Sequence, residues 1–187
     1  YPKVALEIVV EPFPHLHVEE FDVTFMTVEE GFDANVVARP LATTEFIVCA
    51  APAYLARAGT PQQPQDLAQH DYLKFLRQQG GGTSRRYLPL RRADGTGEPV
   101  HVEMPVVLQS VSFEVLYRAA LHGAGVAVLS HLLIAPDLQS GALVHLLPEW
   151  LFGRSTIYAA VPSRKLMPAR VRAFLDFMSA FLPGRIA

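Results

Sequence analysis

The stretch Ala119-Ala120-Leu121-His122-Gly123-Ala124-Gly125-Val126-Ala127-Val128-Leu129-Ser130 decides the fold class of this chain. Its first residues end an amphipathic helix, which is predicted from apolar residues at helical spacing: Val111, Val115, Leu116 and Ala119. Gly123 or Gly125 ends that helix. The run from Val126 to Leu129 is fully apolar, as in a strand buried on both faces. A second helix is predicted from about His131 to Leu138, so helix and strand alternate here as in α/β proteins.

Strand patterns alternate with helical patterns along the rest of the sequence as well. Apolar, alternating or β-forming runs predict strands at 4–10, 21–26, 36–41, 44–50, 72–76, 100–108, 143–147 and 155–161. Short helical segments are predicted from Pro52 and between Pro61 and His70, and Pro168 opens a final helix. This alternation predicts an α/β fold with mostly parallel sheets.

The pattern is interrupted at Gly80-Gly81-Gly82 and resumes its first character near residue 155. One lobe inserted into another, with two crossings between them, explains such an order. We therefore expect a single domain over residues 1–187, with lobe one at 1–76 plus 155–187 and lobe two at 77–154. The length is sufficient for a large hydrophobic core without disulfides or metal.

Composition and charge exclude several classes of function. The net charge is −2, and a chain that binds nucleic acid through its own surface usually carries a basic excess. The cluster Arg85, Arg86, Arg91 and Arg92 is interpreted as a solvated hairpin surface rather than a phosphate-binding patch. The sequence has no run of 18 apolar residues, so we expect no membrane span. A single cysteine, Cys49, rules out an internal disulfide and fits the reducing cytoplasm.

Several short motifs follow one another along the chain. They are Cys49-Ala50-Ala51-Pro52-Ala53-Tyr54-Leu55-Ala56, Gly59-Thr60-Pro61, Pro64-Gln65-Asp66-Leu67-Ala68, the Ala119–Ala127 stretch, Gly141-Ala142-Leu143-Val144, Leu147-Pro148-Glu149-Trp150, Pro162-Ser163-Arg164 and Phe174-Leu175-Asp176-Phe177. In this order and at this spacing they resemble LysR-type transcriptional regulators. The resemblance covers residues 20–182. One departure is Met26-Thr27-Val28, where relatives often have Arg-Ile-Gly.

The resemblance implies an effector-sensing domain with two Rossmann-like lobes joined by two crossover segments, like a type 2 periplasmic binding protein. A small molecule would bind between the lobes, and the protein would be cytoplasmic and form a homodimer or tetramer, with Ala53, Leu55 and Arg57 as interface residues. DNA would be bound only through an N-terminal winged helix-turn-helix, which these 187 residues do not contain. We expect the chain to be an excised piece in which the first strand and helix of the sensing domain are also missing. The alternative function is a solute-binding protein of a transporter.

Ligands of open α/β sheets bind beyond the carboxyl ends of strands, where helix N-termini converge and suit an anion. Three strand ends qualify, and the ligand-binding residues predicted from them are Met26, Thr27, Gln109, Ser110, Leu129 and Ser130. Ser110 and Ser130 are equally well explained as helix N-caps, and Met26 and Thr27 as strand-end packing. Organic acids, aromatic acids and amino acids are the usual effectors in the family.

No catalytic, metal or cofactor site is predicted. His15 and His17 lie on one face of an extended segment, but a third ligand is not evident. Cys49 lies between Val48 and Ala50 and is interpreted as a small buried hydrophobe. The sequence does not combine a nucleophile, a base and an orienting group, so we expect no enzyme activity.

Overall fold

A computed structural model describes residues 5–10, 18–29, 37–76, 87–162 and 167–181. The chain divides into two compact units, which we call unit 1 (Tyr1–Thr44 with Arg154–Ala187) and unit 2 (Glu45–Gly153). Two lobes linked by two crossings were expected. The second crossing lies next to the expected position, whereas the first lies 32 residues earlier than expected, at 44/45 instead of 76/77. The reason is that residues 72–75 pair with strands of unit 2.

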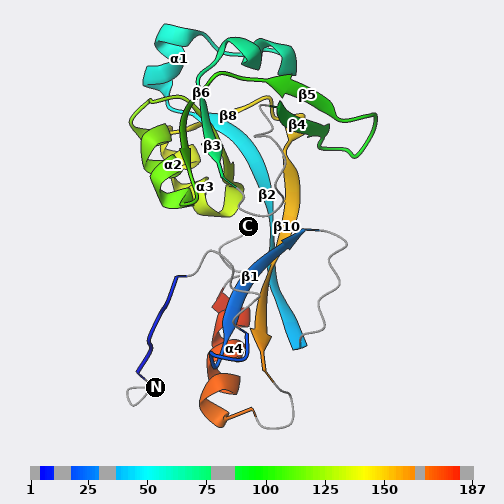
Figure 1. The fold of residues 1–187 in the computed structure, drawn as a ribbon, viewed down its shortest axis with the longest axis vertical. Helices are drawn as coiled ribbons and strands as arrows, with labels where there is room; N and C mark the ends of the chain where they lie inside the picture. Colours follow the sequence, from blue (N-terminus) through cyan, green and yellow to red (C-terminus); the bar gives the residue numbers. More distant parts are fainter. Residues whose placement is uncertain (1–4, 11–17, 30–36, 77–86, 163–166, 182–187) are drawn as a thin grey trace. The chain divides into compact units, whose positions relative to one another are not determined.

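Unit 1 is a small sheet covered by one helix (Figure 1). Strand β1 (Thr24–Glu29) pairs antiparallel with β10 (Gly153–Val161), and β10 lies next to β2 (Val37–Ala50), which contributes residues 37–44 to this unit. Helix α4 (Ala169–Phe181) buries two side chains against the sheet. The resulting core consists of Leu41, Ala159, Val161, Val171 and Leu175.

Unit 2 is built on a parallel core. Strand β3 (Tyr72–Phe75) pairs parallel with both β6 (Val106–Ser110) and β7 (Val126–Ser130). The end of β2 pairs antiparallel with β7 and with β8 (Val144–Leu146). Helices α2 (Phe113–Leu121) and α3 (His131–Ser140) follow β6 and β7 directly.

Successive residues of β2 point to opposite faces of the unit 2 sheet and so supply two cores. Ile47 and Cys49 pack with residues of α2 and α3. Val48 and Ala50 pack with α1 (Pro52–Ala58), with the 3₁₀ helix η2 (Pro64–Gln69), and with part of a second sheet. That sheet has the order β5 (Val100–Glu103), β4 (Tyr87–Arg92), β9 (Trp150–Leu151).

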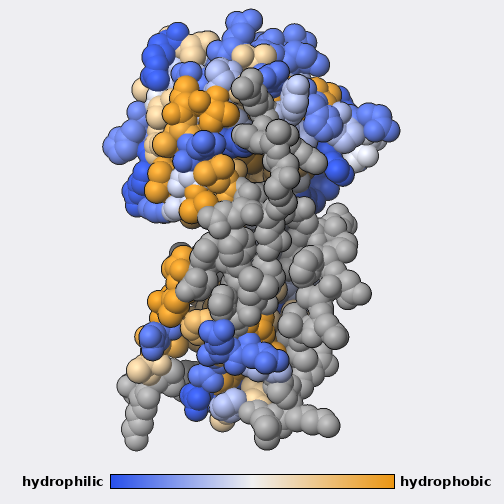
Figure 2. All heavy atoms as spheres, in the orientation of Figure 1, coloured by the Kyte–Doolittle hydropathy of each residue, from blue (hydrophilic) through white to orange (hydrophobic). Residues whose placement is uncertain are grey.

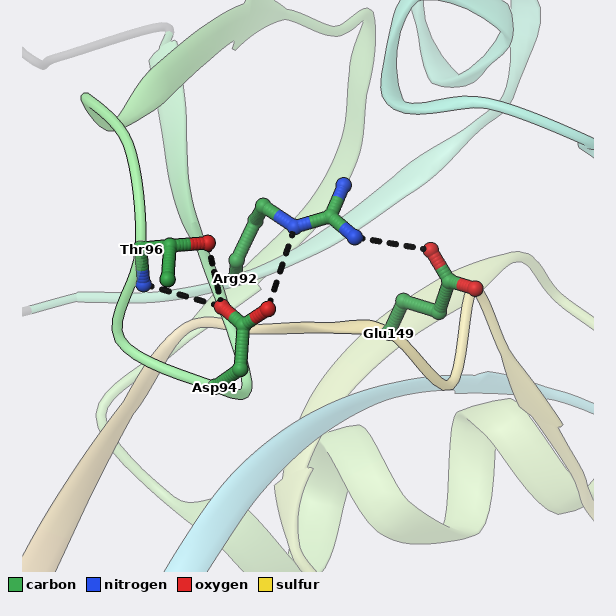
Figure 3. A network of polar contacts seen from close by, with 4 residues as sticks. All are labelled: Arg92, Asp94, Thr96 and Glu149. Atoms are coloured by element: carbon green, nitrogen blue, oxygen red, sulfur yellow. Dashed lines mark hydrogen bonds and ion pairs between the residues drawn. The ribbon is translucent and has the colours of Figure 1, made fainter.

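The turn between β4 and β5 carries a small polar network (Figure 3). Arg92 pairs with Asp94 at 3.6 Å and with Glu149 at 3.3 Å, and its guanidinium lies 5.5 Å from the ring centre of Trp150. Asp94 also accepts hydrogen bonds from the backbone and hydroxyl of Thr96, which hold the pKa of this carboxyl below its usual value. The carboxylates of Asp94 and Glu149 therefore neutralise the charge of Arg92. Arg92 is for this reason a poor phosphate-binding residue.

Two expectations about strands are wrong. The sheets are not mostly parallel. In the described part of the chain, β3 pairs parallel with β6 and β7, whereas the pairs β1–β10, β2–β7, β2–β8, β4–β5 and β4–β9 are antiparallel. Parallel strands need a crossover connection, and α2 provides the one from β6 to β7, which lie on either side of β3. The strand expected at 4–10 is absent from its described part, 5–10, which is exposed. A strand forms only by pairing, and no described strand pairs with this segment.

Gly125 permits a close backbone approach that holds β3 against β7. The Val126 N–H donates to the Asp71 carbonyl at 2.8 Å, and a Cβ on Gly125 would lie 2.6 Å from that same oxygen. We predict that Gly125→Ala lowers the stability by about 1–3 kcal/mol, as overpacking typically does. This corresponds to a fall of roughly 2–12 °C in the unfolding midpoint measured by circular dichroism. Gly153→Ala is the control, since a Cβ there meets nothing within 4 Å; equal midpoints for the two variants would contradict the prediction.

Candidate functional site

The strands of unit 2 end together at one edge of the sheet. The register aligns Phe75 at the end of β3 with Ser110 at the end of β6, and the Leu76 N–H donates to the Ser110 carbonyl at 2.8 Å. Ser130 at the end of β7 is aligned with Phe46 of β2. Four residues from four strands therefore mark this edge, which we call the strand-end site of unit 2.

Two helices begin at the strand-end site. Helix α2 starts at Phe113 with Ser112 as its N-cap, so the expectation that Ser110 is the N-cap is wrong by two residues. The Ser110 hydroxyl instead accepts a hydrogen bond from the Ser112 N–H at 3.0 Å. Helix α3 starts at His131, and Ser130 is its N-cap as expected, although its side chain makes no capping hydrogen bond.

The N-terminus of α3 is the better place for an anion. The first N–H groups of a helix have no partner within the helix and carry partial positive charge. The first turn of α3 contains no acidic residue. The first turn of α2 contains Glu114, which pairs with Arg118 at 2.7 Å. An anion at α3 would therefore meet less repulsion from the helix itself.

Three phenylalanine rings gather at the same edge. Phe113 stacks on Phe75 with 3.9 Å between ring centres, and it lies 5.9 Å from Phe46. Phe113 remains 36% exposed. Val111 and Val115 beside it in the sequence and Leu133 on α3 are also exposed. Figure 2 shows hydrophobic residues gathered over the region of α2 and α3. The aromatic group was not predicted; its signal in the sequence is a phenylalanine at a strand end, Phe75, and another at a helix start, Phe113.

The predicted ligand-binding residues are divided between the two units. Gln109, Ser110, Leu129 and Ser130 lie at the strand-end site of unit 2, whereas Met26 and Thr27 lie on β1 of unit 1, paired with Tyr158 and Ile157. Gln109 and Thr27 are exposed. Met26 and Leu129 are 5% and 0% exposed, so neither offers a ligand an accessible side chain. The ligand-binding role of all six residues stays a prediction.

Histidines lie near the start of α3. Burial lowers the pKa of His145 on β8, the charge of His131 lowers it further, and Glu45 opposes these effects. The Nε2 atom of His145 is buried without a hydrogen-bond partner among the described residues. His145 is therefore neutral at pH 7 and does not add positive charge to this part of the unit.

Other features singled out in the sequence are not tested by the structure. His15, His17, Arg85, Arg86 and the Gly80–Gly82 run lie outside the described residues. Within the described residues, His, Cys, Asp and Glu side chains do not cluster in threes suited to a metal ion. Among the described helices, none is long and apolar enough to cross a membrane.

Two compact α/β units joined by two crossings define the class of two-lobed α/β domains. Residues 1–183 match the family described as LysR substrate binding domain. The chain belongs to this family. Its fold is accordingly the two-lobed, periplasmic-binding-protein-like fold of LysR regulatory domains, as expected.

The relatives are regulators. The chain is 32% identical to the HTH-type transcriptional regulator PtxR of Pseudomonas aeruginosa over 193 residues, covering all of this chain and 59% of PtxR. It is 33% identical to CrgA of Neisseria meningitidis, covering 95% of this chain and 57% of CrgA. The chain thus spans less than two thirds of the length of these curated relatives.

Solved structures agree with these matches. The structure of CrgA from Neisseria meningitidis has a TM-score of 0.78 at 30% identity, covering 97% of this chain and 60% of CrgA. The regulatory domain of AphB from Vibrio vulnificus has a TM-score of 0.75 at 25% identity, covering 97% of this chain and 85% of that domain. The chain is therefore an effector-sensing regulatory domain, and the alternative of a transporter's solute-binding protein is not favoured.

Cys49 on β2 is fully buried in the core that β2 forms with α2 and α3. Burial, with a smaller contribution from Asp137, raises the pKa of its thiol to about 12. Because the thiolate is the reactive form, we predict that 5,5′-dithiobis(2-nitrobenzoate) at pH 8 reacts with the folded chain at least about a hundredfold more slowly than with the chain unfolded in guanidinium chloride. Equal rates in the two states would show that Cys49 is accessible in the folded chain.

Proposed function

We propose that the chain binds a small organic anion at the strand-end site of unit 2, and that this binding controls DNA binding by a longer transcriptional regulator. The observation that carries the proposal is the convergence of Ser110, Ser130 and the N-termini of α2 and α3 at one edge of the sheet. Family membership supports the sensing role.

The chemistry of the site favours an acid with an apolar or aromatic body. A carboxylate would accept hydrogen bonds from the first N–H groups of α3 and from the Ser130 hydroxyl, and a helix N-terminus typically contributes about 0.3–1 kcal/mol to such an anion. The apolar part of the ligand would lie against the exposed part of the Phe113 ring, which stacks on the ring of Phe75. The exposed Gln109 amide is a further hydrogen-bonding group.

Regulation would follow from a shift in population between two arrangements of the protein, one of which binds the effector more tightly. The chain itself carries a net charge of −2, so DNA would be contacted by another part of the longer protein. The curated relatives are transcriptional regulators. We therefore place the protein in the cytoplasm and assign it no catalytic step.

We also propose that the protein acts as a homodimer or tetramer through α1. Ala53 and Arg57 are exposed on this helix and Leu55 is half-buried. Arg57 is held in place by a hydrogen bond from its guanidinium to the Gly123 carbonyl and by contact with the Tyr54 ring at 4.9 Å. A rigid α1 surface of this kind loses little entropy on association.

The direct test is thermal unfolding of the chain against a panel of aromatic acids, aliphatic acids and amino acids. A ligand at 100 times its Kd adds about 2.7 kcal/mol, which corresponds to roughly 5–10 °C for a chain of this size. We predict that one chemical class raises the midpoint selectively. We further predict that Ser130→Val weakens binding of that acid at least about tenfold, because it removes a hydrogen-bond donor and places a branched side chain at the start of α3.

Ser140→Val is the matched control for Ser130→Val. Ser140 lies at the other end of α3 and is exposed, with its hydroxyl bonded to the Asp137 carbonyl. The control should bind the acid as the unsubstituted chain does, and both variants should unfold within a few degrees of it. Unchanged affinity in Ser130→Val would exclude the N-terminus of α3 as the site of the anion.

A further inference from the structure

A pocket of about 450 Å³ lies wholly within unit 1, between α4 and the sheet. This volume falls within the range of small-molecule sites. The pocket shares no residue with the strand-end site of unit 2, and the predicted ligand-binding residues do not line it. An inference about this pocket is therefore independent of the proposed function.

The inner wall of the pocket is aliphatic. Ala159, Val161 and Leu175 are 1%, 4% and 4% exposed, and all three belong to the core of unit 1. The lining contains no aromatic ring. Such a wall offers a hydrocarbon chain a dry surface but gives a flat aromatic ligand no ring to stack on.

The charged residues of the pocket lie at its exposed rim. Arg39 on β2 donates from Nη1 to the Asp176 carboxylate on α4 at 3.0 Å, so these two charges compensate each other. Arg172 precedes Asp176 by one helical turn and is exposed. Within the described residues, Arg172 makes no ion pair or side-chain hydrogen bond. The rim therefore carries one uncompensated positive charge above an aliphatic wall.

We propose that this pocket binds an aliphatic carboxylate, with the carboxylate paired to Arg172 and the hydrocarbon chain against Ala159, Val161 and Leu175. A guanidinium matches a carboxylate with two parallel hydrogen bonds, which makes it the most selective cation for this head group. The single uncompensated cation, Arg172, and the aliphatic wall together fit a ligand that has one negative charge and one hydrocarbon chain. The pocket is thus a second ligand site, separate from the effector site.

The test is calorimetric titration of the 187-residue chain with hexanoate, and with hexanamide as its uncharged counterpart. Hexanoate should bind saturably, and hexanamide at least about tenfold more weakly. Arg172→Gln should reduce the affinity for hexanoate to that for hexanamide. Asp176→Asn should strengthen hexanoate binding, because it removes a like charge from the rim and releases Arg39, and it should leave hexanamide unchanged.

Arg170→Gln is the matched control. Arg170 lies on the same helix, is similarly exposed, and pairs with Asp22 at 3.3 Å without lining the pocket. It should bind hexanoate as the unsubstituted chain does. All of the substituted side chains are exposed, and the unfolding midpoint of each variant confirms that it is folded.

Three results would overturn the proposal. The first is the absence of saturable hexanoate binding, and the second is equal affinity for hexanoate and hexanamide. The third is hexanoate binding that survives Arg172→Gln but is lost in Ser130→Val. That last result would assign hexanoate to the strand-end site, supporting the proposed function while removing this second site.

Discussion

The parallel pairing of β3 with β6 and β7 is the constraint on which the strand-end site depends. Parallel strands end at the same edge of a sheet, and the helices that follow β6 and β7 must begin there. Phe75, Ser110 and Ser130 are therefore brought together by backbone pairing before any of their side chains interact. Because β2 runs antiparallel to β7, it adds Phe46 to the same edge from a distant part of the sequence.

Glycines make this pairing feasible. Gly123 has a φ of 72°, a left-handed conformation that ends α2 and turns the chain back toward the sheet. Gly125 then lets the backbone approach Asp71, and the Val126 N–H bonds to the Asp71 carbonyl at 2.8 Å. The stretch from residue 119 to 130 therefore decides the fold because it sets the position of β7 relative to β3. Arg57 adds a bond from α1 to the Gly123 carbonyl, which ties a further element to this turn.

Much of this could be predicted from local patterns. The apolar run at Val126–Leu129, the proline that opens α1 and the N-cap at Ser130 all depend on neighbours within a few residues, and the structure confirms them. Strand pairing is different, because it depends on segments far away in the sequence that a local pattern does not identify. The segment 5–10 has an apolar strand pattern but no described partner, and β2 is one continuous strand where two were expected. The position of the first crossing was missed because the pairing of β3 with unit 2 is not visible in its four residues.

The candidate site, like the fold, was predictable only where it depends on local sequence. Strand ends can be read locally, which is why Ser110 and Ser130 were correctly expected at the ends of strands. The aromatic group was missed because Phe46, Phe75 and Phe113 come from three separate segments that meet only through the register. Met26 was named from an expected strand end, but β1 continues to Glu29 and Met26 is buried. Leu129 is buried because β7 is covered on both faces.

The most direct test of the sensing role is an amide NMR titration of the ¹⁵N-labelled chain with the acid that most stabilises it against heat. Binding at the strand-end site predicts that the largest saturable shifts occur in the first turn of α3, at His131, Leu132 and Leu133, with smaller shifts at Gln109 and Ser110. Shifts confined to other elements, with these amides unmoved at saturation, would contradict the account.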